Sequence, residues 1–236
     1  MDRFPNHRFL PYALVLPSIT VIAIFLIYPF GQAIYQSFHR INPIRRQLVN
    51  VGWRNYLEMF RSPEYLYSFR NTFIFAVLVI GLGLIISLCI ALLTTQNIRG
   101  SGFYQVAFVW TYAMSPIIAG VMWSLIFDPS IGLMTNLIGN LTGYWINFFN
   151  DTVAAFILVT VASIWVMLGY NIVFFIAGLQ NVPYELKEAA SIDGATTWQV
   201  FWVVTFPMLS PTVAFLVFVN TVYAFFQSFG LVDVVT

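Results

Sequence analysis

Charged residues are scarce in this chain. Of its 236 residues, 8% are charged and 60% are hydrophobic, whereas a soluble domain carries roughly 25% charged residues. The composition therefore excludes an ordinary soluble domain and indicates an integral membrane protein.

Cysteine and histidine are nearly absent as well. The single cysteine, Cys89, lies among apolar neighbours in the middle of a predicted helix, which excludes disulfide and metal frameworks and favours a packing role. The two histidines, His7 and His39, fall at opposite ends of the first predicted helix, and no nucleophile has a base nearby in the sequence. We therefore expect no catalytic residue and no metal site.

The few charges divide the chain into five long uncharged runs, at residues 9–38, 71–98, 100–127, 152–184 and 194–232. Each run exceeds the ~20 residues that a helix needs to cross a bilayer. The runs are solid with Leu, Ile, Val, Phe and Ala instead of alternating, so they favour helices over a β-barrel. We predict an all-α membrane bundle with five spans, near residues 10–30, 68–94, 103–127, 153–178 and 206–229.

Two connections between the spans carry structure of their own in this prediction. Residues 31–67 contain five arginines and two glutamates, and we interpret them as a small extramembrane loop after the first helix. Within it, residues 53–60 follow Gly52 and form a short amphipathic helix that lies on the membrane surface. In residues 128–151, Leu133, Leu137 and Leu141 recur at helical spacing, which predicts a second surface helix, or otherwise a hydrophobic linker.

Residues 184–205 are a polar interruption between two apolar runs. Pro183 suits the first turn of a helix, residues 184–192 are rich in helix formers, and Gly194 permits a sharp turn after that helix. A second helical stretch, 196–205, runs to Pro207, where the fifth span begins. We predict two short helices at an angle, joined directly to membrane helices at both ends; the alternative is a hairpin in the headgroup region.

This segment resembles the EAA loop of ATP-binding-cassette importer permeases. That pattern is Glu-Ala-Ala, three residues, Gly, and then a hydrophobic stretch and Pro; it is met here by Glu188, Ala189, Ala190, Gly194 and Pro207, with Asp193 before the glycine and Ala195 after it. In that family the loop inserts into a cleft of a cytoplasmic ATPase subunit. The resemblance therefore implies a coupling role for residues 184–205, in which Glu188 and Asp193 hold basic groups of the ATPase.

The resemblance continues outside the loop. Arg99-Gly100-Ser101, Phe127-Asp128-Pro129, Leu179-Gln180 and residues 220–226 are similar to the A-type permease subunit of glycerol-3-phosphate importers, within the maltose-type, binding-protein-dependent family. The family implies a type I permease fold in a bacterial plasma membrane. It also implies a second homologous permease, a dimer of ABC ATPase subunits and an external solute-binding protein as partners, besides membrane lipid. No nucleic acid is expected.

The solute and the cofactors follow from the same resemblance. Glycerol-3-phosphate or a related glycerophospho compound is the expected solute, and the sugar or polyol branch of the family stays open. The chain has no GxxxxGK[ST] phosphate loop, so ATP and magnesium are expected in the partner ATPase and no cofactor in this chain. An ion-driven secondary carrier, the alternative class, would show intramembrane acidic residues and two corresponding halves, and neither is visible.

Polar residues within the fourth and fifth spans are the candidate lining of a transport pathway, because polar groups at membrane depth are costly unless they face a cavity or a partner. They are Trp165, Tyr170, Asn171, Asn220, Tyr223 and Gln227. Asn220 and Gln227 are two helical turns apart, so we expect them on one face. The alternative is that the amides only bond helices together. Apart from Arg70 at the outer edge of the second span, no Lys or Arg lies inside the spans, so a phosphate would depend on charges from the other subunits.

Orientation and completeness are two further expectations. The positive-inside rule favours placing the arginine-rich loop in the cytoplasm, whereas the coupling motif requires the amino terminus and residues 184–205 to be cytoplasmic; we follow the motif. Members of the family carry a sixth core helix, so we expect the sequence to be incomplete after Thr236, a true five-helix permease being the alternative.

Overall fold

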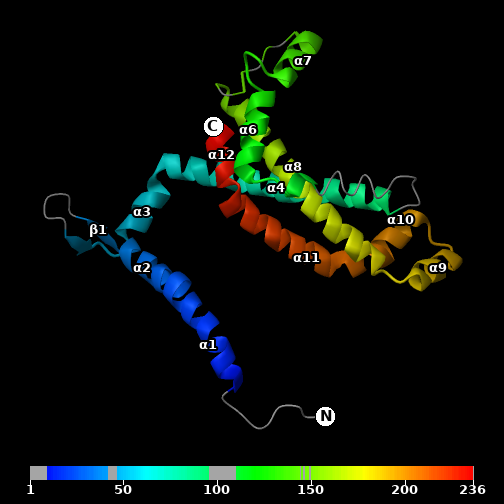
Figure 1. Cartoon of the computed structure of the whole chain (residues 1–236), viewed down its shortest axis with the longest axis horizontal. Helices are drawn as coiled ribbons and strands as arrows, with labels where there is room; N and C mark the ends of the chain where they lie inside the picture. The colour runs from blue at the N-terminus through cyan, green and yellow to red at the C-terminus, as the bar shows by residue number, and fades with distance from the viewer. Residues whose placement is uncertain are drawn as a thin grey trace. The chain divides into compact units, whose positions relative to one another are not determined.

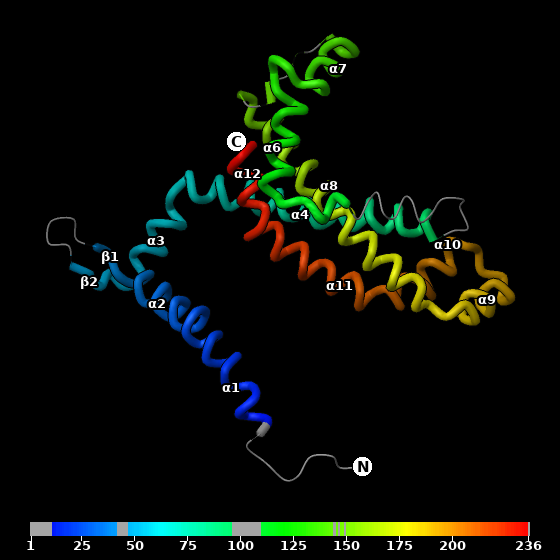
Figure 2. Tube along the Cα trace, in the orientation of Figure 1, coloured from blue at the N-terminus to red at the C-terminus, as the bar shows by residue number. Residues whose placement is uncertain are grey.

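The computed structural model describes residues 10–41, 47–95, 110–143, 145, 147, 148 and 150–235. The chain divides into two compact units, Met1–Phe69 and Arg70–Thr236. Figures 1 and 2 show that the described residues are almost entirely helical. Among the described residues, four helices are long and apolar enough to cross a membrane: Pro11–Ser37, Pro63–Thr94, Thr152–Gln180 and Thr197–Gln227.

The first unit begins with one long apolar helix. It consists of α1 (Leu10–Ile22), the π-helical turn η1 (Ala23–Ile27) and α2 (Tyr28–Ser37), so the first predicted span is confirmed and extends to Ser37. In the π-turn, the Tyr28 N–H donates to the carbonyl of Ala23. The wide turn lies directly before Pro29, whose ring would clash with the carbonyl four residues earlier in a regular α-helix.

A short hairpin and a helix complete this unit. Strands β1 (His39–Ile41) and β2 (Leu48–Asn50) pair antiparallel, with His39 opposite Asn50. Gly52 adopts a φ of +54°, a conformation that suits glycine, and helix α3 (Arg54–Arg61) follows. The predicted short helix is thus confirmed, whereas the hairpin was not predicted.

The second unit is built around α8 (Thr152–Gln180), which is buried along most of its length. Asp151 caps its first turn, because the side-chain carboxylate accepts hydrogen bonds from the backbone N–H groups of Val153 and Ala154. Helix α8 packs against α4 (Pro63–Thr94), α6 (Pro116–Ile126) and α11 (Phe206–Val222), and α6 packs closely against α12 (Phe229–Val235). Helix α7 (Leu133–Thr142) forms where Leu133, Leu137 and Leu141 predicted it.

The third predicted span is not one continuous helix. Residues 103–109 lie outside the described residues, and the helix that includes residues 110–112 stops before α6 begins at Pro116. Ser115 is extended, with φ −61° and ψ 140°, a conformation that proline favours in the residue before it. The prediction of an unbroken helix over 103–127 is therefore wrong, since Pro116 begins a new helix.

The fifth predicted span also begins earlier than expected. Helix α10 (Thr197–Val200), the π-turn η2 (Phe201–Thr205) and α11 run on into the π-turn η3 (Tyr223–Gln227) as a 31-residue span. Pro207 lies in the first turn of α11 and does not separate two elements. The π-turn before it accommodates the proline, as in the first span.

Candidate functional site

Helix α9 (Tyr184–Ile192) and helix α10 form the predicted angled pair, and backbone geometry fixes the turn between them. Gly194 has a φ of +85°. The Ala195 N–H donates to the Ala190 carbonyl at 3.0 Å, and the Gly194 N–H donates to the Ser191 carbonyl at 3.1 Å. This pair of bonds is a Schellman motif, which satisfies the last carbonyls of α9 and requires a left-handed residue at Gly194. The prediction that Gly194 ends the first helix is confirmed.

The second helix of the pair, α10, is capped at its first turn. The backbone N–H of Thr196 donates to Oε1 of Gln199 at 2.8 Å, and the Thr196 hydroxyl accepts from the Gln199 N–H at 3.4 Å. This reciprocal arrangement is a capping box, which fixes the first turn of α10. Both sides of the turn are therefore held by local hydrogen bonds, and the loop keeps its shape without a partner.

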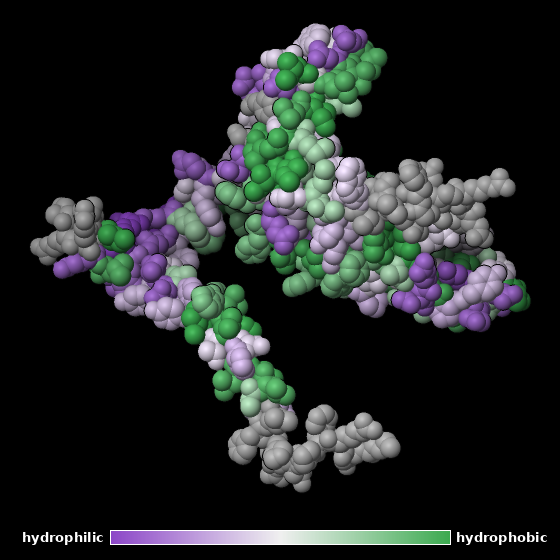
Figure 3. Space-filling model, in the orientation of Figure 1, coloured by the Kyte–Doolittle hydropathy of each residue, from purple (hydrophilic) through white to green (hydrophobic). Residues whose placement is uncertain are grey.

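Most of the motif residues around this turn are accessible at the surface of the chain. Glu188, Ala189 and Asp193 are exposed, and Ala190 and Ala195 are half-buried. A hollow of about 310 Å³ in the bend is lined by Ala190, Asp193, Gly194, Ala195, Gln199, Val200 and Val203. Large apolar side chains project beside it, with Tyr184 72%, Ile192 80% and Trp198 69% exposed. Figure 3 shows hydrophilic residues gathered around α9.

The angled pair is tied tightly to the helices on either side. A Cβ atom at Gly178 in α8 would lie 2.7 Å from Leu209 Cδ2 and 3.0 Å from Thr212 Oγ1 in α11. The absence of a side chain at Gly178 thus allows α8 and α11 to approach closely just before the loop. Leu209 is fully buried at this crossing.

Two predicted pathway residues, Asn171 in α8 and Asn220 in α11, bond to each other. Asn171 Nδ2 donates to Asn220 Oδ1 at 3.1 Å, and Asn220 Nδ2 donates to Asn171 Oδ1 at 2.8 Å and to the Leu216 carbonyl at 2.8 Å. Both side chains are fully buried. The two amides thus join α8 to α11. This is the alternative to lining a transport pathway that the sequence analysis gave for them.

The remaining pathway candidates are dispersed. Trp165 is half-buried and packs edge-on against Trp123, with ring centroids 6.0 Å apart. Tyr170 stacks obliquely on Tyr112 at 4.9 Å. Tyr223 is 2% exposed and begins the π-turn η3.

The expectation that Asn220 and Gln227 share a face is wrong. Asn220 is buried, whereas Gln227 is exposed and Ser228 is buried in its place. The cause is η3, where the Ser228 N–H donates to the Tyr223 carbonyl five residues back. Because this wide turn adds a residue relative to an α-helix, it shifts every later side chain around the helix axis.

A cavity that the sequence did not predict lies beside this π-turn. Its volume is about 480 Å³, and it is lined by Asn71, Thr72, Phe75, Thr152, Ala155, Phe156, Val159, Ala224, Phe225, Ser228, Phe229 and Val232. The lining is mostly apolar, with hydroxyl and amide groups from the starts of α4 and α8 and from the residue after η3. None of the six predicted pathway residues lines it. The polar residues Asn71 and Thr72, near the start of the second predicted span, were the sequence signal from which this cavity could have been predicted.

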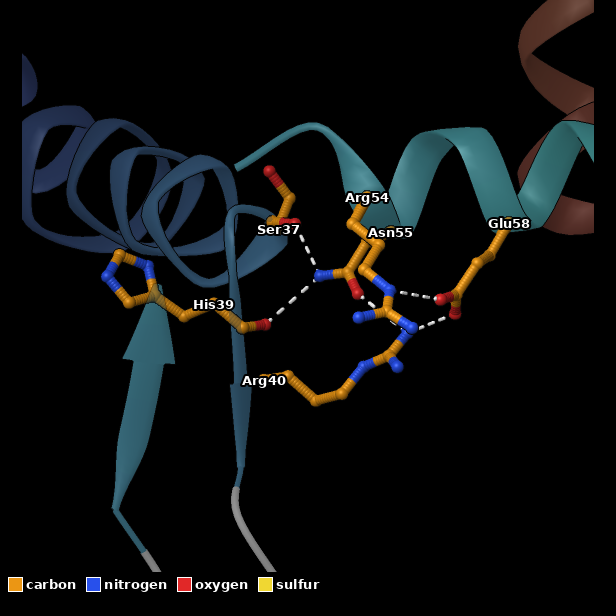
Figure 4. Close-up of polar contacts among 6 residues, drawn as sticks. All are labelled: Ser37, His39, Arg40, Arg54, Asn55 and Glu58. Atoms are coloured by element: carbon orange, nitrogen blue, oxygen red, sulfur yellow. Dashed lines mark hydrogen bonds and ion pairs between the residues drawn. The ribbon is translucent and has the colours of Figure 1, made fainter. Parts of the chain in front are cut away.

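In the first unit, two arginines of the loop after the first span share one carboxylate. Glu58 accepts from Arg40 at 2.5 Å and from Arg54 at 2.7 Å. These hydrogen bonds, the one from Arg40 foremost, lower the pKa of Glu58 from its ordinary value. Asn55 Nδ2 donates to the carbonyls of Ser37 and His39, as Figure 4 shows. Helix α3 is thereby fixed to the end of the first span.

Comparisons with known proteins identify the family and agree with the fold. The family model described as "Binding-protein-dependent transport system inner membrane component" matches residues 8–235. The sn-glycerol-3-phosphate transport system permease protein UgpA of Pectobacterium atrosepticum is 42% identical over 231 residues, which are 98% of this chain and 78% of the relative. The UgpA protein of Rhizobium meliloti is 40% identical over 99% of this chain and 79% of its own length.

Two solved structures share the fold. A bacterial ABC transporter involved in the import of the acidic polysaccharide alginate superposes with a TM-score of 0.75 at 22% identity, over 91% of this chain and 73% of that chain. The alginate ABC transporter in complex with an alginate pentasaccharide-bound periplasmic protein gives the same TM-score and identity, over 89% of this chain and 70% of that chain. At this identity the likeness concerns the fold.

Proposed function

The chain belongs to the family of binding-protein-dependent transport system inner membrane components, and we propose that it forms the translocation pathway of an ATP-driven importer together with a second, homologous permease. It is a multi-pass inner membrane protein with the type I importer permease fold. The single observation that carries the proposal is the preformed, exposed angled pair α9–α10, with the motif residues around its hollow.

The angled pair is the docking element for a cytoplasmic ATPase dimer. Its shape is fixed in advance by the Schellman motif and the capping box, so docking costs little ordering entropy. Glu188 and Asp193 are exposed and are available to accept charge-assisted hydrogen bonds from basic groups of the ATPase. ATP and magnesium are held by that partner, this chain holds no cofactor, and the amino terminus lies in the cytoplasm with the loop.

Motion of the loop reaches the bilayer through α8 and α11. These helices flank the loop, cross closely at Gly178, and are joined again at the Asn171–Asn220 pair. A displacement of the angled pair therefore moves both helices together and switches the pathway between inward-facing and outward-facing states. An external solute-binding protein delivers the solute to the outward-facing state, whose population depends on the ligand's differential affinity for the two states.

The solute is sn-glycerol-3-phosphate or a related glycerophospho compound. Two relatives at 40% and 42% identity over nearly the whole chain carry that solute in their names. A sugar or polyol is the second candidate, because the described spans offer hydroxyl and amide groups and few charged side chains. Trp165, Tyr170, Asn171, Asn220, Tyr223 and Gln227 remain the proposed pathway residues, to which the cavity beside η3 adds Asn71 and Ser228.

The coupling role is tested by uptake into proteoliposomes that contain the assembled transporter, its ATPase and its binding protein. Glu188→Lys and Gly194→Pro should abolish solute uptake while the amount of permease in the membrane stays unchanged, because they alter the docking surface and the turn. Glu64→Lys makes the same charge reversal at an exposed glutamate outside the docking element and serves as the control. Full uptake by both motif variants would refute the coupling role.

The solute is tested separately with the purified binding protein of the same transporter. Glycerol-3-phosphate should bind and should compete with radiolabelled solute for uptake, whereas sugars should not. If the binding protein bound a sugar tightly and did not bind glycerol-3-phosphate, the chain would still be an importer permease, but its solute would be a sugar.

A further inference from the structure

Helix α3 exposes an apolar stripe in the first unit. Trp53, Leu57 and Phe60 are 68%, 56% and 60% exposed, and their spacing places them on one side of the helix. Arg54, Glu58 and Arg61 form the neighbouring polar stripe. Large apolar side chains on one face and arginines on the other are the pattern of helices that lie in the interface of a bilayer.

The stripe is held in a fixed orientation by its contacts. Trp53 packs edge-on against Phe38 with ring centroids 5.3 Å apart and lies 5.4 Å from the ring of Tyr56. The Tyr56 hydroxyl donates to Ser37 Oγ at 2.7 Å. Trp53 is therefore ordered from one side while its other side stays exposed, as in an amphipathic residue at a membrane boundary.

The chain on both sides of α3 fixes its depth. Ser37 is the last residue of the first span, and Asn55 and Tyr56 bond directly to it. The span Pro63–Thr94 begins two residues after α3 ends at Arg61. Within the first unit, the described side chains of the first span are not buried, so the apolar stripe continues along the chain into a helix whose own surface is apolar.

We propose that α3 lies in the membrane interface where the first span leaves the bilayer, with Trp53, Leu57 and Phe60 inserted between lipid acyl chains. Arg54 and Arg61 then lie at the level of the lipid phosphates. The partner of this surface is the bilayer, and the helix acts as an anchor that sets the depth of the first span. The proposal rests on the membrane assignment of the chain and is independent of the solute and of the ATPase.

The test compares two adjacent positions at the same level of the helix. Nitroxide labels are introduced by Phe60→Cys and, as a matched control, Arg61→Cys, each in a Cys89→Ser background and in the assembled transporter in bilayers of phosphatidylethanolamine and phosphatidylglycerol. Collision rates are measured with oxygen, which enters the bilayer, and with a water-soluble nickel complex. The ratio of oxygen to nickel collisions should be several-fold higher at position 60 than at position 61.

Three results would overturn the proposal. Equal nickel access at both positions would place the stripe in water. Low access of both reagents at position 60 would show that a protein subunit covers it. If both oxygen and nickel collisions at position 60 fell only after the solute-binding protein was added, the stripe would be a docking surface for that protein. A transporter with normal uptake in any of these cases would leave the proposed function intact, so the two failures are distinguishable.

Discussion

Replacing Asn220 by leucine removes both hydrogen bonds that join α8 to α11 in the middle of the unit. Leucine has the same branching at Cγ as asparagine, so the shape is approximately retained. Interhelical bonds of this kind contribute about 0.6 kcal/mol each in membrane bundles, and the unpaired Asn171 amide that remains costs roughly 1–3 kcal/mol more. We expect Asn220→Leu and Asn171→Leu each to reduce the free energy of unfolding by about 2–4 kcal/mol.

The double variant is the informative one. When both residues are leucine no buried amide is left unpaired, so the pair should be destabilised by only about 1 kcal/mol, the contribution of the two bonds. The two substitutions are then strongly non-additive, because the double variant should be about 3–7 kcal/mol more stable than the sum of the two single effects predicts. Equilibrium unfolding in mixed detergent micelles measures all three variants.

A control pair separates this coupling from general loosening of α8. Asn171→Leu combined with Gln227→Leu should be additive, because Gln227 is exposed and has turned away from α8. Additivity for Asn171 and Asn220 as well would refute the reasoning, since it would mean that the two amides do not depend on each other in the folded protein.

Three further predictions concern other parts of the chain. Gly178→Leu should lower stability by about 1–3 kcal/mol, because its side chain would overlap Leu209; Gly81→Leu, with open space around it, is the thermal-unfolding control. Thr196→Ala should destabilise the start of α10 by about 1 kcal/mol and speed amide hydrogen exchange there. Hydrogen bonds from Arg40 and Arg54 lower the pKa of Glu58 in the folded protein, so its ion pairs stabilise the fold above the ordinary glutamate pKa and are lost as the pH falls through the lowered pKa. A nitroxide label on α3 should therefore become more mobile in acid. Glu58→Gln should abolish this pH dependence of the label's mobility.

Features that depend on a few neighbouring residues were predicted well. The helix over 184–192, its end at Gly194 and the short helix after Gly52 follow from local signals: a proline at the helix start, a run of helix formers and a glycine at each turn. Four spans were predicted because hydrophobic runs of sufficient length are recognisable without knowing what packs against them.

Features that depend on the exact winding of a helix were missed. The faces assigned to Asn220 and Gln227 assumed a regular α-helix, and the single π-turn η3 between them was enough to expose Gln227. Pro116 itself signals the break before it, but the span over 103–127 was predicted from hydropathy, which is continuous through the proline. The cavity beside η3 combines residues from α4, α8 and α12, so no stretch of sequence contains it.

The sequence by itself determined that this is a helical membrane protein, where most of its spans lie, and which loop carries the coupling motif. These follow from composition, run length and residue spacing, which act over a turn or a span of chain. Only the tertiary structure decided that Asn171 pairs with Asn220, 49 positions away. It also decided that Leu209 packs closely against Gly178 and that α3 is hydrogen-bonded to Ser37. Such contacts are set by the register and winding of packed helices, because a shift of one residue carries a side chain about 100° around its axis.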